Sequence, residues 1–429
     1  LDRGYFQSLY FTDPDGQVLE IATAGPGYAI DEPADQLGRT LITPPDERLP
    51  SGRDAAGIRT LTHPEPVPTV TPDMALQGIH HISAITDDLG AAGEFYEAAL
   101  GLSLVKKTVN PDDGATKHFF WATYDGQEVA PHSSLTFFEW PNTPAGQWGV
   151  GGVHHLALGV ESPEAQLMWK RRLTDAGVPV TGPLDRGYFQ SLYFSDPDGQ
   201  ILEIATAGPG YAIDEPADAL GRTLITPPED RLPVGRDTAS IQAATHPEPV
   251  PTVTAGMELQ GIHHISAITD DLEAAGDFYE GALGLSLVKK TLNQDDGQTR
   301  HYFWAHYDGT TVAPHSAMTL FGWPGSTLQA RPGHGQTHHV AFRARDDQEQ
   351  EAWRDHLLGL GLDVSQVMER NYFRSIYFRA PDGLLLEIAT DGPGFAVDEA
   401  PAALGQELKL PEWLEGRRER IETALAPLS

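Results

Sequence analysis

Pairs of adjacent histidines occur four times in the chain and are its clearest candidates for chemistry. They are His80-His81, His154-His155, His263-His264 and His338-His339. Apolar and polar residues alternate around each pair, as in 79–85, which predicts a β-strand with one imidazole on each face. The chain has no cysteine, so any metal would need imidazole and carboxylate ligands.

Three glutamates share a second pattern, a carboxylate on the apolar face of a predicted strand. They are Glu20, Glu203 and Glu387, each in a Leu-Glu-Ile sequence. Such a carboxylate is costly to bury unless something neutralises it, and a metal ion would do so. Glu203 follows His155, and Glu387 follows His339, by 48 residues each (203 − 155 and 387 − 339). Glu20 has no preceding His-His strand in this chain.

Two imidazoles and one carboxylate on a curved sheet would form the facial triad of non-haem Fe(II) oxygenases, which leaves positions open for substrate and dioxygen. The simpler alternatives are a hydrogen-bonded structural histidine and a solvated glutamate on a half-buried strand. Recurrence of the histidine at one position in four diverged segments, together with the constant spacing to glutamate, favours the metal.

The elements that must position these residues form repeats. Shifting the chain by 183 residues places Leu1 on Leu184 and His81 on His264, and only 11 of the first 71 residues differ from their partners. This indicates a recent duplication, so a motif found in both copies counts as one observation. A weaker repeat lies within each copy, and it gives four modules that begin near residues 78, 152, 261 and 336.

Each module predicts the order β-α-β-β-β. After the His-His strand, an amphipathic stretch over 89–100 predicts a helix, and strand-like runs follow at 102–109, 118–124 and 134–140. The sister module ends in a hairpin over 188–206, with the turn Asp196-Pro197-Asp198-Gly199. The predicted fold class is α+β, with tandem modules forming curved, barrel-like mixed sheets.

The repeats also predict the domain organisation. The expected parts are a partial module with a Pro-rich linker at 1–75, a two-module domain at 76–210, a linker at 211–258, a second two-module domain at 259–395 and a helical tail at 396–429. The partial module lacks its first strand and would leave an open sheet edge that could pair with another copy, so a homo-oligomer is one option.

The charge balance excludes one class of partner. The chain has 29 basic and 61 acidic residues, a formal net charge of −32, which argues against nucleic acid, whose binding requires basic patches. No apolar run is long enough to span a membrane, and the N-terminus shows no signal-peptide pattern, so we expect a cytoplasmic protein without membrane contacts. Dispersed acidity with seven lysines is typical of a halophilic surface.

The modules that begin with His-His and end with Asp-Pro-Asp-Gly-Gln-Ile-Leu-Glu resemble the vicinal oxygen chelate superfamily. Residues 76–429 are most similar to its ring-cleaving dioxygenases of the hydroquinone or catechol type. The resemblance implies a non-haem Fe(II) centre, with Mn(II), Ni(II) or Zn(II) as alternatives, held by His81, His339 and Glu387. It also implies that His80, Arg370 and Tyr377 handle a small dihydroxylated aromatic substrate, with dioxygen as the second substrate.

Duplication adds a prediction that the resemblance does not supply. A pseudo-two-fold relation would bring His155, Glu203 and His264 together as a twin metal site, flanked by His263, Arg186 and Tyr193. The copies differ at Glu139, which is Gly322 in the later one, and a fourth ligand from Glu139 would favour glyoxalase chemistry. A glyoxalase-type lyase or isomerase, and a non-catalytic binding protein of the same fold, are therefore the alternative functions.

Aromatic residues on the predicted strands complete the expected site. One option is that they wall a pocket for an aryl ring, although residues at strand spacing more often belong to the core. They are Phe119, Trp121, Tyr302 and Trp304.

Overall fold

The computed structural model describes residues 8–12, 18–22, 70, 74–112, 114–254 and 256–425. The chain divides into a unit of residues 1–67 and a unit of residues 68–429. In the first, β1 (Ser8–Thr12) and β2 (Val18–Ala22) form an antiparallel hairpin in which Glu20 pairs with Tyr10. The rest of the predicted partial module, its open edge and the Pro-rich linker lie outside the described residues.

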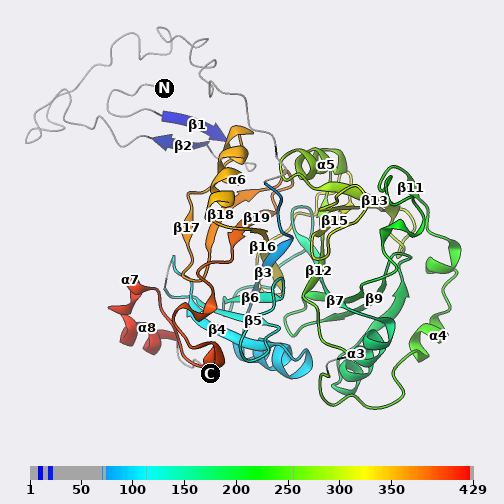
Figure 1. Ribbon diagram of the computed structural model, residues 1–429, viewed down its shortest axis with the longest axis horizontal. Helices are drawn as coiled ribbons and strands as arrows, with labels where there is room; N and C mark the ends of the chain where they lie inside the picture. Colours follow the sequence, from blue (N-terminus) through cyan, green and yellow to red (C-terminus); the bar gives the residue numbers. More distant parts are fainter. Residues whose placement is uncertain are drawn as a thin grey trace, which may run out of the picture. The chain divides into compact units, whose positions relative to one another are not determined.

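The second unit contains two mixed sheets, each with the two His-His strands of one pair of modules at its centre (Figure 1). The first sheet has eight strands, in the order β17 (Met368–Glu369), β18 (Arg374–Arg379), β19 (Leu385–Thr390), β16 (Gln336–Ala344), β3 (Ile79–Thr86), β6 (Ser134–Glu139), β5 (Lys117–Ala122) and β4 (Ser103–Val109).

The second sheet repeats this arrangement with the other two modules. It has nine strands, in the order β11 (Leu224–Ile225), β13 (Ser286–Leu292), β14 (Arg300–Ala305), β15 (Ala317–Gly322), β12 (Ile262–Thr269), β7 (Val153–Val160), β10 (Ile201–Thr206), β9 (Gln190–Ser195) and β8 (Thr181–Asp185). The predicted α+β class and the β-α-β-β-β modules are confirmed.

Module pairing does not follow the order of the chain. The first sheet joins the first and fourth modules through the antiparallel pair β3 and β16, and the second joins the second and third through β7 and β12. Each sheet therefore takes strands from both 76–210 and 259–395, and the boundaries of these two domains stay a prediction. The pairing places each His-His strand beside another, with His81 opposite Ala341 and Ser83 opposite His339.

Helices pack on the face of each sheet that lies away from the metal-ligand candidates. They are α2 (Leu89–Glu94), continued by the π-helix η3 (Phe95–Ala99), then α3 (Pro163–Asp175), α5 (Leu272–Gly281) and α6 (Asp347–Gly359). Asp88 caps α2 by accepting from the amides of Gly90 and Ala91. Tyr96 and Trp353 from these helices are fully buried in the main apolar core.

The linker and the C-terminal tail fold back onto the sheets. The linker holds η4 (Tyr211–Ile213), η5 (Glu229–Arg231) and α4 (Thr238–Ala243); the tail holds η6 (Phe395–Val397), η7 (Pro401–Ala403), α7 (Glu412–Glu415) and α8 (Arg418–Leu425). Two fully buried lysines fix them: Lys106 Nζ lies 2.7 Å from Asp398 Oδ1, and Lys289 Nζ lies 2.9 Å from Glu215 Oε2. Among the described residues, no helix has the length and apolar character needed to cross a membrane.

Candidate metal centres

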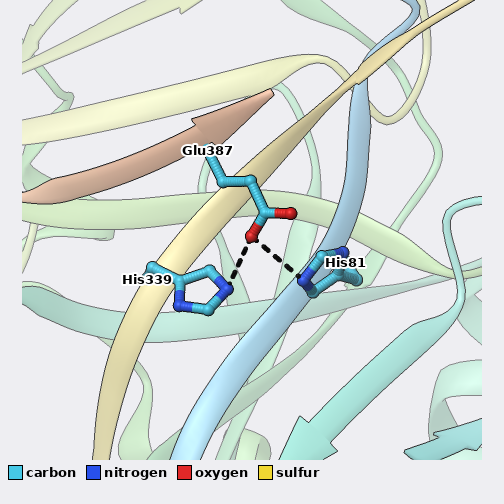
Figure 2. A group of neighbouring side chains, drawn as sticks. All are labelled: His81, His339 and Glu387. Carbon is cyan, nitrogen blue, oxygen red and sulfur yellow. Dashed lines mark ion pairs between the residues drawn. The ribbon is translucent and has the colours of Figure 1, made fainter. Parts of the chain in front are cut away.

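The first candidate centre joins three strands of the first sheet. His81 comes from β3, His339 from β16 and Glu387 from β19, and all three are buried. Glu387 Oε2 lies 3.5 Å from His81 Nε2 and 2.8 Å from His339 Nε2 (Figure 2). One donor atom from each residue therefore lies within 4.8 Å of the others, as a shared divalent cation requires.

The unpaired atoms of this triad fit a metal ion. Glu387 Oε2 and His339 Nε2 are buried without a hydrogen-bond partner, whereas Glu387 Oε1 accepts a 2.5 Å bond from Ser375. Burial opposes the charge of Glu387, but the two imidazoles hold the pKa of its carboxyl well below the usual value. Burial lowers the pKa of His81 to about 3 despite the nearby Glu387. An ionised carboxylate beside a neutral imidazole is the protonation state that binds a cation.

The second candidate centre repeats this geometry in the second sheet. Glu203 Oε2, on β10, lies 3.0 Å from His155 Nε2 on β7 and 3.5 Å from His264 Nε2 on β12. All three residues are buried. Burial opposes the charge of Glu203, but the nearby imidazoles of His264 and His155 hold the pKa of its carboxyl well below the usual value. The structure thus brings together both predicted sets of ligands, whose metal binding stays a proposal.

The first histidine of each pair supports the second. In all four pairs the two Nδ1 atoms lie 2.8 or 2.9 Å apart. Metal binding through Nε2 leaves the proton of the ligand on Nδ1, from which it donates to the neighbouring imidazole and fixes the ring. His80 occupies this position behind His81, and its Nε2 faces Asp391 Oδ1 at 3.6 Å. His80 is therefore placed to position a ligand, whereas His338 lines the cavity beside the first centre.

Arg370 and Tyr377 do lie at the first centre, as the sequence predicts. Arg370 Nε donates to the Tyr377 hydroxyl at 3.1 Å, and its Nη1 lies 2.9 Å from Asp112 Oδ2. Burial raises the pKa of Tyr377, so that its phenol stays protonated. Burial opposes the charge of Arg370, yet Tyr377 and Asp112 hold its pKa above the usual value. The following Asn371 adopts φ 68°, where the equivalent Gly187 has φ 89°, so both loops turn sharply.

A cavity of about 210 Å³ opens onto the first centre. His118 and Phe120 of β5, with Phe138 and Trp140, form part of its wall. Of the two options for Phe119 and Trp121 the structure shows the core, because these residues lie one position away from His118 and Phe120, on the opposite face of β5. The same displacement by one residue applies to Tyr302 and Trp304, since His301 and Phe303 line the second cavity, of about 750 Å³.

Glu139 does not supply a fourth ligand in this structure. Its Oε2 pairs with Lys117 Nζ at 2.8 Å, and its Oε1 accepts from the Leu89 amide at 3.1 Å. The position that corresponds by strand register to Glu387 is Thr136: Glu387 lies opposite Ala341, two residues after His339, and Thr136 lies opposite Ser83, two residues after His81. The first module thus brings one ligand and a hydroxyl.

The sequence reasoning missed this hydroxyl and its partner, His118. Thr136 Oγ1 lies 2.8 Å from both Ser83 Oγ and His118 Nε2, and His118 stacks on Phe138 with ring centroids 4.0 Å apart. Burial drives the pKa of His118 well below its usual value, and the imidazole is neutral. The period-two alternation along 117–122 was the signal that could have pointed to His118, because it places His118 on the same face as Phe120.

Comparison with known proteins agrees with this fold. The family model described as Glyoxalase/Bleomycin resistance protein/Dioxygenase superfamily matches residues 78–204 and 261–388. The chain belongs to this superfamily, which confirms the family predicted from the His-His modules.

Individual relatives in this superfamily include ring-cleaving enzymes. The chain is 32% identical over 358 residues to the "Putative ring-cleaving dioxygenase MhqA" of Bacillus subtilis (strain 168), covering 83% of this chain and 100% of that protein. It is 28% identical over 349 residues to the chlorohydroquinone/hydroquinone 1,2-dioxygenase of Sphingobium indicum, covering 81% of this chain and 95% of that protein. A crystal structure titled "putative dioxygenase" from Bacillus subtilis matches with a TM-score of 0.65 and 31% identity, over 83% of this chain and 98% of that one.

Proposed function

We propose that this protein is an Fe(II)-dependent ring-cleaving dioxygenase of the extradiol type that acts on a dihydroxylated aromatic of the hydroquinone or catechol class. The observation that carries the proposal is the convergence of His81, His339 and Glu387 at the end of a cavity lined by aromatic side chains. This donor set is the facial triad of non-haem iron oxygenases. The names of the relatives support the same substrate class.

The reaction needs no external reductant. One ring C–C bond and the O–O bond break, both oxygen atoms enter the product, and the four electrons that reduce dioxygen come from the ring. When bound, Fe(II) supplies a Lewis acid that lowers the pKa of a substrate hydroxyl and a redox centre for dioxygen. The remaining tasks, which are binding, orientation and proton transfer, fall to side chains around the cavity.

Two of those side chains are placed to interact with the substrate oxygens, one as a donor and the other as an acceptor. Tyr377 is a protonated phenol whose oxygen accepts from Arg370, so its own proton can be donated to a substrate oxygen. His118 is neutral, and in the tautomer whose Nε2 donates to Thr136 its Nδ1 is left to accept a hydrogen bond from a substrate hydroxyl. His338 donates from Nε2, because its Nδ1 accepts from the ligand His339. Phe120 and Phe138 provide apolar contacts for the ring.

Two observations argue against the alternative functions. A glyoxalase-type centre would need a second carboxylate, and the corresponding position holds Thr136 while Glu139 is engaged by Lys117. A non-catalytic binding protein would have no use for buried, unpaired ligand atoms such as Glu387 Oε2.

Oxygen consumption tests the proposal directly. Protein loaded anaerobically with Fe(II) is mixed with hydroquinone or catechol in an oxygen electrode, and the product is identified by mass spectrometry after use of ¹⁸O₂. We expect oxygen uptake with both labelled atoms in a ring-opened product. Absence of uptake by iron-loaded protein across a series of catechols and hydroquinones would exclude the dioxygenase.

A further inference from the structure

We infer that His155, Glu203 and His264 form a second working metal centre, whose own cavity takes dihydroxylated rings with a larger apolar substituent than the first centre accepts. The metal site follows from the side chains of the second sheet alone. The substrate class also rests on the proposed function.

The unpaired atoms of the second triad require a cation even more strongly than those of the first. Glu203 has 0% exposure, and neither of its carboxylate oxygens has a hydrogen-bond partner within the described part of the chain. His155 Nε2 is likewise buried and unpaired, although it lies 3.0 Å from Glu203 Oε2. In the first centre, Ser375 satisfies one oxygen of Glu387. A buried carboxyl group without hydrogen-bond partners is costly, and a divalent ion held by the three residues removes that cost.

The side chains proposed to handle substrate at the first centre all have counterparts here. Arg186 Nη2 lies 2.9 Å from Asp295 Oδ2, as Arg370 pairs with Asp112, and its guanidinium lies 5.1 Å from the centre of the Tyr193 ring. His301 Nε2 lies 2.8 Å from Thr319 Oγ1, as His118 does from Thr136. The second sheet therefore holds a complete set of groups around its triad, which exceeds what a purely structural copy needs.

The cavities differ in size and in one wall. The second measures about 750 Å³ against about 210 Å³ for the first. The additional wall comes from the segment after α3, with Val178 and Val180, and from Ile241 of the linker helix α4. Lys170 holds α4 in place, because its Nζ donates to the carbonyls of Ile241 at 2.8 Å and Gln242 at 3.2 Å. Lys170, Thr238 and Gln242 also line this end of the cavity, but Val178, Val180 and Ile241 give it an aliphatic surface, so the extra space suits an apolar substituent on the ring.

Metal stoichiometry tests the site without reference to activity. The full chain is loaded anaerobically with Fe(II), desalted and analysed for iron per folded chain. We expect two equivalents for the wild type and for Glu161→Gln, a control at an exposed glutamate. We expect one equivalent for Glu203→Gln, for His264→Ala and for Glu387→Gln, and none for the double variant Glu203→Gln/Glu387→Gln. A wild type with one equivalent that Glu203→Gln and His264→Ala leave unchanged would overturn the second centre.

The single variants then separate the two substrate ranges. In Glu203→Gln only the first centre can bind metal, and in Glu387→Gln only the second can. Oxygen uptake is measured with hydroquinone and with a hydroquinone that carries a linear six-carbon chain. The ratio of kcat/KM for the long over the short substrate should be at least about tenfold higher in Glu387→Gln, a discrimination that one or two buried methylenes provide. Equal ratios would overturn the difference in range.

Blocking the extra wall gives an independent readout. In Ile241→Trp the indole would fill the space beside α4, so the preference of the Glu387→Gln background for the long substrate should disappear while one iron per chain is retained. Persistence of the preference would refute the assigned wall. If both single variants hold one iron and neither consumes oxygen, the proposed function and the substrate class fail, but the second metal site stands.

Discussion

The two centres of this molecule have nearly the same ligand geometry and very different surroundings. In both sheets a carboxylate oxygen lies 2.8 to 3.5 Å from two imidazole nitrogens, while the cavities measure about 210 and 750 Å³. The ligands lie on paired central strands, whose register fixes side-chain positions. The larger cavity takes part of its wall from the linker helix α4, outside the repeated module. Strand register therefore determines the donor set, and linkers determine the space around it.

A second difference lies behind the ligands. At the first centre His80 faces the carboxylate of Asp391, which also binds Arg343 at 2.7 Å. Position 207, the counterpart of Asp391, is Ala207, and the equivalent His263 has no such carboxylate. A carboxylate behind a ligand imidazole increases its basicity and fixes its orientation. We therefore expect the first centre to bind its metal more tightly than the second.

Removal of a first-centre ligand should produce the largest effect. His81→Ala deletes one imidazole and leaves His339 and Glu387 without their third partner. Because residues behind a ligand already change affinity or activity by about 10 to 100-fold, loss of a ligand on the Glu203→Gln background, where only the first centre remains, should reduce kcat for unsubstituted hydroquinone by more than about 100-fold. Steady-state oxygen uptake measures the change, with Glu161→Gln as the control. Retention of wild-type kcat would show that the small substrate reacts elsewhere.

The next effect should come from the phenol at the first centre. Tyr377→Phe removes the hydroxyl that accepts from Arg370 but keeps the ring beside His339, with centroids 5.6 Å apart. On the Glu203→Gln background, where only the first centre remains, loss of a proton donor should lower kcat by about 100-fold, with iron content unchanged. Single-turnover kinetics with hydroquinone and metal analysis of the same sample separate the two quantities. A parallel loss of iron would make Tyr377 a structural support of the ligands instead.

A smaller effect should follow when Asp391, which lies behind His80 and the ligand His81, is replaced by alanine, the residue at the equivalent position of the second centre. Asp391→Ala removes the carboxylate that faces His80. The Asp391 side chain is 45% exposed, and its Oδ1 lies 3.6 Å from His80 Nε2. We therefore expect a loss of Fe(II) affinity of about tenfold at most, the low end for residues that support a metal ligand. Competition with a chelator on the Glu203→Gln background, where only the first centre remains, gives the affinity. An unchanged affinity would mean that His80 orients His81 without help from Asp391.

Much of this arrangement was accessible from the sequence, for identifiable reasons. The alternation of apolar residues around each His-His pair and the constant spacing to Glu203 and Glu387 identified one histidine and one glutamate of each triad. These are local patterns, and they locate ligands whenever the strands lie in the core of a sheet. The family resemblance supplied His81, and the pseudo-two-fold relation between the copies supplied His264. In the tail that was predicted to be helical at 396–429, the structure has the short helices α7 and α8.

The features that could not be predicted depend on contacts between distant segments. The sequence could not decide whether Phe119 and Trp121 wall the cavity or pack in the core, because it does not say which face of β5 meets the helices and which meets the metal ligands. The equivalence of Thr136 with Glu387 appears only from strand register. The contribution of α4 to the second cavity depends on a fold-back of the linker that no periodicity encodes.

The smallest predicted effect concerns Glu139, whose counterpart in the later copy is Gly322. Glu139→Gln removes the ion pair with Lys117, whose partners are 15% and 11% exposed, but keeps an oxygen for the Leu89 amide. Because such pairs contribute little, the free energy of unfolding should fall by about 0.5 to 1 kcal/mol. Denaturant unfolding gives this value, and iron content should stay at the wild-type level. A loss of one equivalent would instead make Glu139 a ligand in solution and would favour a glyoxalase-type centre with two carboxylates.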